Sequence, residues 1–220
     1  MLETLVKGSY LMIPLLVCSW LTLAVVIDRA LAFRAHRRID NRSLRAHVLQ
    51  RLDAGRVDEA GRLCADTPGP VSAVLLAGLQ SYDKHRQRNK HPEAVTAAMD
   101  KAMDDCSLHA MSAVERRLNV LATIGNAAPL LGMTGTVTGM IRSFDALSKM
   151  GGLNAAAVAG GISEALITTA TGLLIALAAV IPYNLFSAMA DRIDLEIEES
   201  SSELLDFVTT RLETARPDAP

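Results

Sequence analysis

Charge is nearly absent from a long stretch close to the carboxyl end of the sequence. Between Lys149 and Asp191 the only charged residue is Glu164, and the remaining positions are apolar, small or hydroxylated. This absence is not typical of a solvated surface, and it indicates a membrane-embedded segment. A carboxylate is unfavourable in such surroundings, so Glu164 by default indicates an ion path.

Cysteine is also scarce. Cys18, Cys64 and Cys106 are too few and too scattered to form a disulfide framework. Cys106 and His109 are one helical turn apart, but no second pair of ligands lies nearby in the sequence. We interpret them as ordinary residues of a helix surface and expect no metal site.

Sequence motifs of common enzymes are missing as well. The sequence offers no nucleophile elbow, no clustered metal ligands and no basic patch interleaved with aromatic residues. The glycine-rich run 132–139 lies within an apolar segment and lacks the lysine of a phosphate-binding loop. We therefore expect no enzyme, no cofactor and no nucleic-acid partner.

What the sequence does contain is three charge-free segments, each long enough to cross a bilayer as a helix. They cover residues 8–27, 118–141 and 165–190. The first lacks a small-x-small cleavage site before Asp28 and is longer than a typical signal core, which favours a retained span over a signal peptide. The fold class predicted is an all-α membrane protein with three transmembrane helices.

Basic residues predict the orientation of these spans. Residues 28–117 contain sixteen Lys and Arg against twelve Asp and Glu, whereas the amino terminus contributes Lys7 alone. The positive-inside bias places 28–117 and the carboxyl terminus in the cytoplasm, and the amino terminus and the 142–163 turn outside.

The 28–117 segment is predicted to be helical. A helix follows a cap at Asn41 or Ser43 and ends at Gly55, and shorter helices cover 57–65 and 71–82. The polar run 84–90 indicates a solvated connection, although it could also touch anionic lipid.

The second and third spans are predicted to extend into this helical bundle. Pro92 suits the first position of a helix, and no breaker follows before Pro129, so one helix is expected to run into the second span. After the third span, an apolar stripe predicts an amphipathic helix, and Ser201 occupies the position where one apolar residue of the stripe is missing. The stripe contains Ile193, Ile197, Leu204, Val208 and Leu212. Nine acids against three bases in 191–220 complement the basic loop, which favours docking between the two.

Small residues repeat along the second and third spans. Positions 125, 128, 132, 136 and 139 share one helical stripe, and 165, 169, 172, 176 and 179 form a similar one. Small side chains let helix backbones approach closely in lipid. The predicted packing positions are Gly125, Pro129, Gly132, Gly135, Gly139 and Gly172.

Two threonines in these stripes favour a polar conduit over packing alone. Thr136 and Thr169 lie at a similar depth, roughly 7–9 Å inside one edge of antiparallel spans, with Glu164 near that edge. Glu164 and Thr169 are about 140° apart on an ideal helix, so either the helix is distorted or they face different neighbours. Glu164 could instead be a first-turn acid favoured by the helix dipole.

Two long motifs resemble the MotA/TolQ/ExbB proton channel family, in its ExbB/TolQ branch. One covers 128–144, from Ala-Pro-Leu-Leu-Gly-Met-Thr-Gly to Arg-Ser-Phe, and the other covers 161–173 with 181–184, which reads Ile-Pro-Tyr-Asn. The three-span layout is similar over essentially the whole chain, whereas MotA-type members have four spans.

The resemblance implies a homopentamer in the bacterial inner membrane, with a pore between its second and third spans. Thr136, Thr169 and Glu164 match the family's pore-lining residues. An ExbD/TolR-like single-span partner, as a dimer in the pore, would supply the proton-carrying aspartate. Proton flow would then energise a TonB- or TolA-like protein that acts on the outer membrane.

On this reading the outer side of the membrane is the periplasm. The predicted order is a periplasmic amino terminus (1–7), transmembrane helix 1 (8–27), a cytoplasmic loop domain (28–117), transmembrane helix 2 (118–141), a periplasmic turn (142–163), transmembrane helix 3 (164–190) and a cytoplasmic amphipathic helix (191–220). The main alternative is a passive scaffold of a membrane complex, in which the small residues serve packing and Glu164 only begins a helix. A permease component is a third possibility, but the sequence suggests neither a midplane substrate site nor an ATPase partner.

Overall fold

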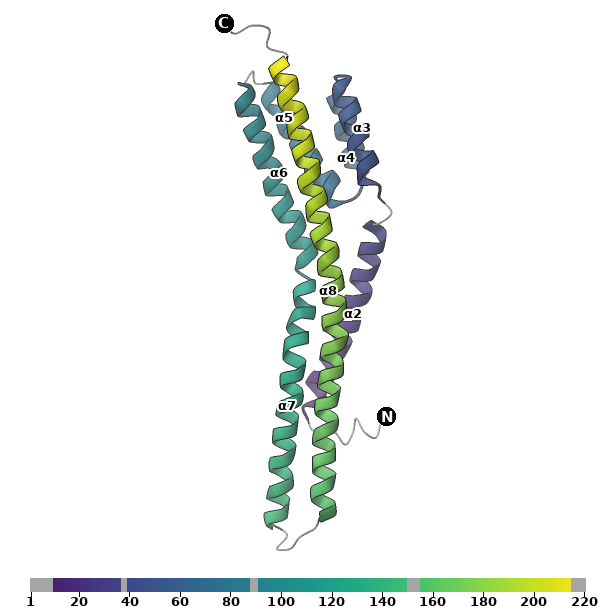
Figure 1. The fold of residues 1–220 in the computed structure, drawn as a ribbon, viewed down its shortest axis with the longest axis vertical. Coiled ribbons are helices and arrows are strands. Elements are labelled where there is room, and N and C mark those ends of the chain that lie inside the picture. The colour runs from purple at the N-terminus through teal and green to yellow at the C-terminus, as the bar shows by residue number, and fades with distance from the viewer. Residues whose placement is uncertain (1–9, 37–38, 88–90, 150–154, 215–220) are drawn as a thin grey trace. The chain divides into compact units, whose positions relative to one another are not determined.

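The computed structural model describes residues 10–36, 39–87, 91–149 and 155–214, and over these ranges it contains helices and no strands (Figure 1). The helices are α2 (Met12–His36), α3 (Asn41–Asp53), α4 (Val57–Asp66), α5 (Pro70–Arg86), α6 (Pro92–Glu115), α7 (Leu118–Lys149) and α8 (Ala155–Thr214). Three of them, α2, α7 and α8, are long and apolar enough to cross a membrane. The predicted all-α membrane class is confirmed.

The chain divides into two compact units. The apolar unit comprises Met1–Leu31 and Arg116–Ser187, and the polar unit comprises Ala32–Glu115 and Ala188–Pro220. Helix α8 is continuous through both, as the predicted extension of the third span requires.

In the apolar unit, α2, α7 and α8 pack around a small core of aliphatic and alanine side chains. The core residues are Met12, Leu15, Ile124, Ala128, Ile175, Ala176 and Ala179. Many large apolar side chains on the outer faces stay exposed, among them Trp20 at 72% and Leu174 at 67%. Exposure on this scale suits contact with lipid or with other membrane helices and does not suit water.

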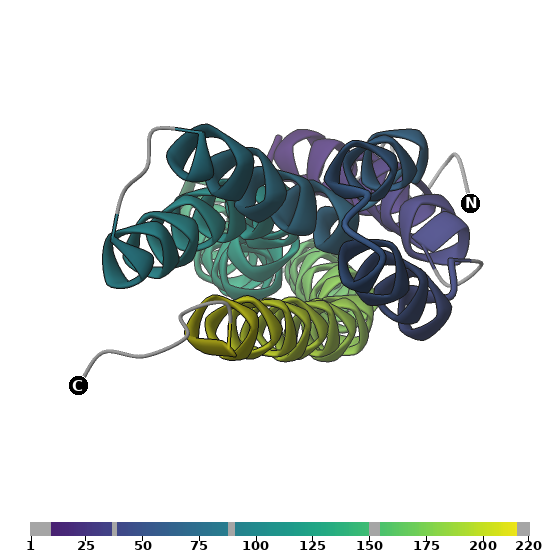
Figure 2. The ribbon, with the colours of Figure 1, turned by 90° about the horizontal axis from the view of Figure 1, so that it is seen from above.

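The polar unit is built from α3–α6 and the carboxyl-terminal part of α8. Seen from above in Figure 2, α3–α6 all lie on one side of that part of α8. Gly78 of α5 allows close packing, because a Cβ there would lie 2.7 Å from Met103 Sδ of α6 and 3.3 Å from Leu204 of α8. Ser81 on α5 also donates to the Ala98 carbonyl of α6 at 2.9 Å.

The predicted stripe on α8 forms the buried face of this helix in the polar unit, with one correction. Ile193, Ile197, Leu204 and Val208 are buried, but the intervening buried position is Ser200 and not Ser201. The Ser200 hydroxyl donates to the Glu196 carbonyl at 2.5 Å, which satisfies it inside the packed face.

Opposite charges on α3 and α8 meet as expected. Arg45 of α3 makes ion pairs with Glu199 at 3.1 Å and Glu203 at 2.8 Å, and Asn41 donates to Glu196 at 2.6 Å. The basic loop and the acidic helix therefore dock through specific contacts within the polar unit.

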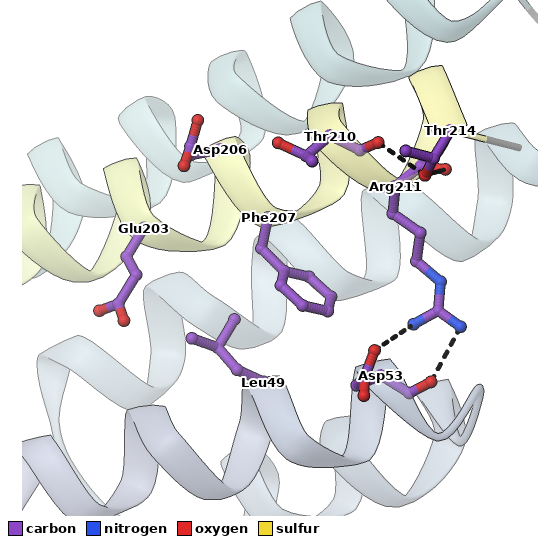
Figure 3. A pocket seen from close by; sticks show the side chains of 8 residues that line it. All are labelled: Leu49, Asp53, Glu203, Asp206, Phe207, Thr210, Arg211 and Thr214. Atoms are coloured by element: carbon purple, nitrogen blue, oxygen red, sulfur yellow. Dashed lines mark hydrogen bonds and ion pairs between the residues drawn. The ribbon is translucent and has the colours of Figure 1, made fainter.

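A second link between α3 and α8 lies where α3 ends (Figure 3). Arg211 of α8 donates hydrogen bonds to the carbonyls of Leu52 and Asp53, the latter at 2.9 Å. The last carbonyls of a helix lack partners within it, so this guanidinium caps α3. Gly55 follows with φ of +76°, a left-handed conformation that glycine adopts without strain.

Four details of the predicted helices are corrected. The cap of α3 is Asp40, which accepts from the backbone N–H groups of Arg42 and Ser43 at 3.2 Å. Helix α5 continues to Arg86, so the first part of the expected 84–90 connection is helical. The helix that begins at Pro92 does not run unbroken into the second span, because a two-residue turn at 116–117 separates α6 from α7.

The fourth correction concerns the turn between the second and third spans. Helix α7 extends to Lys149 and α8 begins at Ala155, so most of the segment 142–163 is helical.

Neither proline nor glycine explains the break between α6 and α7 at 116–117, where two arginines occupy the turn.

Candidate functional site

Helices α7 and α8 lie side by side (Figure 1), and the glycines predicted to pack there meet the facing helix. The two helices are antiparallel, because Gly125 near one end of α7 meets Val180 while Gly139 near the other end meets Ala165. The interface therefore follows the glycines of α7 and the small residues of α8.

The two backbones approach each other closely at Gly132 and Gly172. A Cβ on Gly132 would lie 3.1 Å from Thr169 Cα, and one on Gly172 would lie 2.6 Å from the Ala128 carbonyl oxygen. Only glycine leaves room for backbone at these distances, because the atoms opposite cannot rotate away. Larger residues at either position would force the helices apart.

The remaining glycines of α7 face side chains of α8. A Cβ would lie 2.6 Å from Val180 Cγ2 at Gly125, 2.5 Å from Thr168 Cγ2 at Gly135 and 2.7 Å from Ala165 Cβ at Gly139. Carbon atoms pack best at about 3.5–4.0 Å, so these positions also favour glycine.

Pro129 lies within α7 and is half-buried. Proline has no N–H to donate, so the Gly125 carbonyl loses its usual helical donor. In a membrane an unpaired carbonyl is unfavourable, and transmembrane helices tolerate such a proline where neighbouring helices or local adjustments compensate.

Thr169 lies on the α7 side of α8 and connects the two helices directly. Its half-buried hydroxyl donates to the Gly132 carbonyl at 2.7 Å, from one helix to the other. Thr136 is half-buried too, but its hydroxyl donates to the Met133 carbonyl of its own helix at 2.7 Å. The structure thus brings Thr169 onto Gly132, and it places Thr136 one turn further along α7.

Glu164 is half-buried and precedes Ala165, which packs on Gly139. Successive residues of a helix differ by about 100°, so the carboxylate lies on a flank of the α7–α8 interface. Thr169 lies toward α7, on the opposite side of the interface centre. On ideal helix geometry the two side chains are about 140° apart, with Thr169 directed to Gly132.

Thr168 is the residue whose importance was not predicted. Its side chain is 0% exposed, and its hydroxyl donates to the Glu164 carbonyl at 3.1 Å. The spacing of Gly161, Ala165, Thr168 and Gly172 by three and four residues was the available signal, since it marks one helix face.

Polar contacts lie near both ends of the apolar unit. Arg117, in the turn just before α7, pairs with Asp28 of α2 at 2.6 Å, and Arg29 pairs with the same carboxylate at 2.8 Å. At the other end of α7, the Arg142 guanidinium lies 4.8 Å from the centroid of the Tyr10 ring. The guanidinium–ring contact is attractive because the face of the ring is electron-rich.

Residues 66–199 match the model of the MotA/TolQ/ExbB proton channel family, which is more than half of the chain. The chain belongs to this family. Among its curated relatives is the Tol-Pal system protein TolQ of Pseudomonas aeruginosa, 32% identical over 80% of this chain and 74% of that protein. The biopolymer transport protein ExbB of Neisseria gonorrhoeae is 30% identical, over 77% of each chain. TolQ of Haemophilus influenzae is 29% identical over 92% of this chain and 86% of its own length.

These relatives confirm the resemblance to the ExbB/TolQ branch. The matched range contains all of α5, α6 and α7 and the part of α8 from Ala155 to Glu199. As a member of the MotA/TolQ/ExbB family, the chain is a channel- and transport-associated membrane protein.

Proposed function

We propose that this chain is the channel-forming subunit of an ion-driven motor in the bacterial inner membrane. Five copies would surround a pore lined by α7 and α8, and a dimer of an ExbD/TolR-like single-span protein would occupy that pore. The observation that supports this most is Glu164, a half-buried carboxylate in an apolar helix that also carries the Thr169 hydroxyl five residues further on.

The proposed pathway needs a titratable group from the partner. Hydroxyls such as those of Thr136 and Thr169 pass a proton along hydrogen bonds but do not store its charge. In its proposed second and third spans this chain offers one carboxylate, that of Glu164, near one edge, and hydroxyls further in. A carboxyl group on the partner's helix would bind the proton between the two aqueous sides.

The driving energy per proton is modest. A membrane potential of about 150 mV supplies roughly 3.5 kcal/mol per charge. We infer that each proton drives one small rearrangement of the partner, whose periplasmic part then energises a TonB- or TolA-like protein.

The proposed topology follows the positive-inside bias. The amino terminus and the connection between α7 and α8 face the periplasm, whereas 28–117 and 191–220 lie in the cytoplasm. The proposed spans are 8–27, 118–141 and 164–190.

The first test is co-purification from native membranes followed by mass measurement of the intact complex. We expect five copies of this chain and two copies of a protein with one span and an aspartate within it. A complex that lacks such a single-span protein would contradict the proposed motor function.

The second test separates the motor from a passive scaffold. In vesicles that contain the whole complex, Glu164→Ala or Thr136→Val should abolish proton flux while the pentamer still assembles. Thr134→Val is the matched control for Thr136, because its exposed hydroxyl also bonds only within α7. The scaffold instead predicts that Glu164→Gln is silent and that Gly132→Leu alone destroys assembly.

A further inference from the structure

Two neighbouring threonines of α8 make different contacts with α7. Thr169 donates its hydroxyl to the Gly132 carbonyl, whereas Thr168 presses its methyl group onto Gly135. Gly132 and Gly135 lie one helical turn apart, so the two contacts belong to the same short section of the interface. Thr168 is also completely buried, so no part of its side chain is exposed.

The Thr168 methyl lies where a side chain at position 135 would begin. A Cβ on Gly135 would lie 2.5 Å from Thr168 Cγ2 and 3.1 Å from Thr168 Cβ. The side chain is β-branched and restricted in χ1, so it cannot turn aside easily. Any larger residue at 135 therefore moves α8 away from α7 by about 1 Å, the difference from an ordinary carbon–carbon contact.

Such a movement acts directly on the neighbouring hydrogen bond. The Thr169 hydroxyl lies 2.7 Å from the Gly132 carbonyl, and a shift of about 1 Å takes it beyond hydrogen-bonding distance. Misplacement on this scale is large for a reacting group.

We propose that Thr168 is a positioning residue, whose methyl group against Gly135 sets the α7–α8 separation at which Thr169 contacts Gly132. This inference rests on the proposed function, in which Thr169 lines the proton pathway. In this proposal Thr168 acts through the shape of its side chain. The hydroxyl of Thr168 is satisfied by the Glu164 carbonyl and takes no part in the relay.

The test uses the full chain in its complex with its partner, reconstituted in vesicles. Thr168→Val keeps both branches of the side chain and removes only the hydroxyl. We expect its proton flux per complex to stay within twofold of wild type and to keep the same pH profile. Loss of flux from an intact Thr168→Val complex would overturn the proposal, because the hydroxyl would then be the functional group.

A compensating pair tests the contact itself. Gly135→Ala should lower the flux at least tenfold and the melting temperature by several degrees. Adding Thr168→Ser removes Cγ2, the atom nearest to the new Cβ, and should recover most of both losses relative to Thr168→Ser alone, since a close contact of 3.1 Å with the Cβ of residue 168 remains. A double variant as impaired as Gly135→Ala would overturn the proposal.

The outcomes remain informative if a variant does not assemble or the wild type does not conduct. If Gly135→Ala prevents assembly, restored assembly in the double variant supports the contact and continued failure contradicts it. If the wild-type complex shows no proton flux, the proposed function fails, while the melting temperatures of the four chains still decide whether Thr168 and Gly135 are coupled.

Discussion

Thr169 and Thr171 lie two residues apart on α8, and their hydroxyls contact different groups. The Thr169 hydroxyl donates across the interface to Gly132 at 2.7 Å, whereas that of Thr171 donates to the Ile167 carbonyl of its own helix at 2.8 Å. Thr171 lines a groove of about 380 Å³ between α2 and α8. Thr169 and Thr171 are chemically identical, but only the Thr169 hydroxyl bonds to the other helix of the proposed pathway.

We expect Thr169→Val to reduce proton flux at least tenfold, because the variant keeps the shape of the side chain and removes the hydrogen bond to α7. Thr171→Val is the matched control and should leave the flux within twofold of wild type. Flux is measured as the initial rate of acidification of reconstituted vesicles. Equal losses in both variants would argue against a specific role for Thr169.

Cys64 supplies a second residue-level prediction. Its side chain is 2% exposed, and burial raises the pKa of its thiol to about 11. Since the thiolate is the reactive form, alkylation of Cys64 by N-ethylmaleimide at pH 8 should be at least about 100-fold slower than alkylation in the unfolded chain. Cys106, which is half-buried, should react first. Rapid modification of Cys64 in the folded protein would contradict the described burial.

The same thiol predicts the sign of a pH effect on stability. Its pKa is higher in the folded chain than its ordinary value of 9.0, so the unfolded chain loses the proton first as the pH rises. The contribution of the protonated Cys64 thiol to the stability of the folded chain is fully present below pH 9 and is lost progressively toward pH 11. Cys64→Ala should remove this part of the alkaline decline in melting temperature.

The arrangement of single residues at the interface was only partly predictable. The sequence predicted packing at Gly135 and also placed position 136 on a packing stripe, but it is Gly135 that lies opposite Thr168, whereas Thr136 bonds within its own helix. Steps of three and four residues both return to nearly the same side of a helix. Small residues at 135 and 136 satisfy either choice, so only the partner helix decides between them.

At the level of elements, the end of α3 depends on a side chain more than 150 positions away in the sequence. Arg211 bonds the carbonyls of Leu52 and Asp53, and its guanidinium lies 3.8 Å from the Asp53 carboxylate. We expect Arg211→Ala to destabilise the last turn of α3 by about 1 kcal/mol, since the site is partly exposed and its ion pair is screened.

Hydrogen exchange measures this local effect. The amides of Ala54, Gly55 and Arg56 bond to carbonyls of that last turn and should exchange about fivefold faster in Arg211→Ala. Arg62→Ala is the control, because Arg62 is exposed on α4 and should leave these amides unchanged. Unchanged exchange in Arg211→Ala would show that the cap has no energetic role.

Among the elements, long apolar helices were predictable and their joints were not. Pro92 and Gly55 marked the start of α6 and the end of α3 because these residues restrict or free the backbone. The turn at 116–117 contains neither proline nor glycine. Asp40 caps α3 although Asn41 and Ser43 were predicted, because aspartate, asparagine and serine can all cap a helix. Contacts with other helices select among such equivalent options.

At the level of the whole molecule, the proposed orientation can be tested by labelling. In a chain whose Cys18 and Cys106 are replaced by serine, Ser148→Cys should react with a membrane-impermeant maleimide in intact cells. Leu195→Cys should react only after the inner membrane is opened. Both positions are exposed, so access to the reagent depends on the side of the membrane. The opposite pattern would reverse the assignment of the two sides.

The unbroken course of α8 implies that its length is constrained independently of its composition. The helix presents Ala165 and Thr169 to α7, and further on it buries Ile197 and Leu204 in the polar unit. Deleting one residue between these two parts would rotate everything beyond it by about 100°, although every remaining side chain would be unaltered. We therefore expect homologous sequences to substitute freely on the outward positions of this helix and yet to align there without gaps.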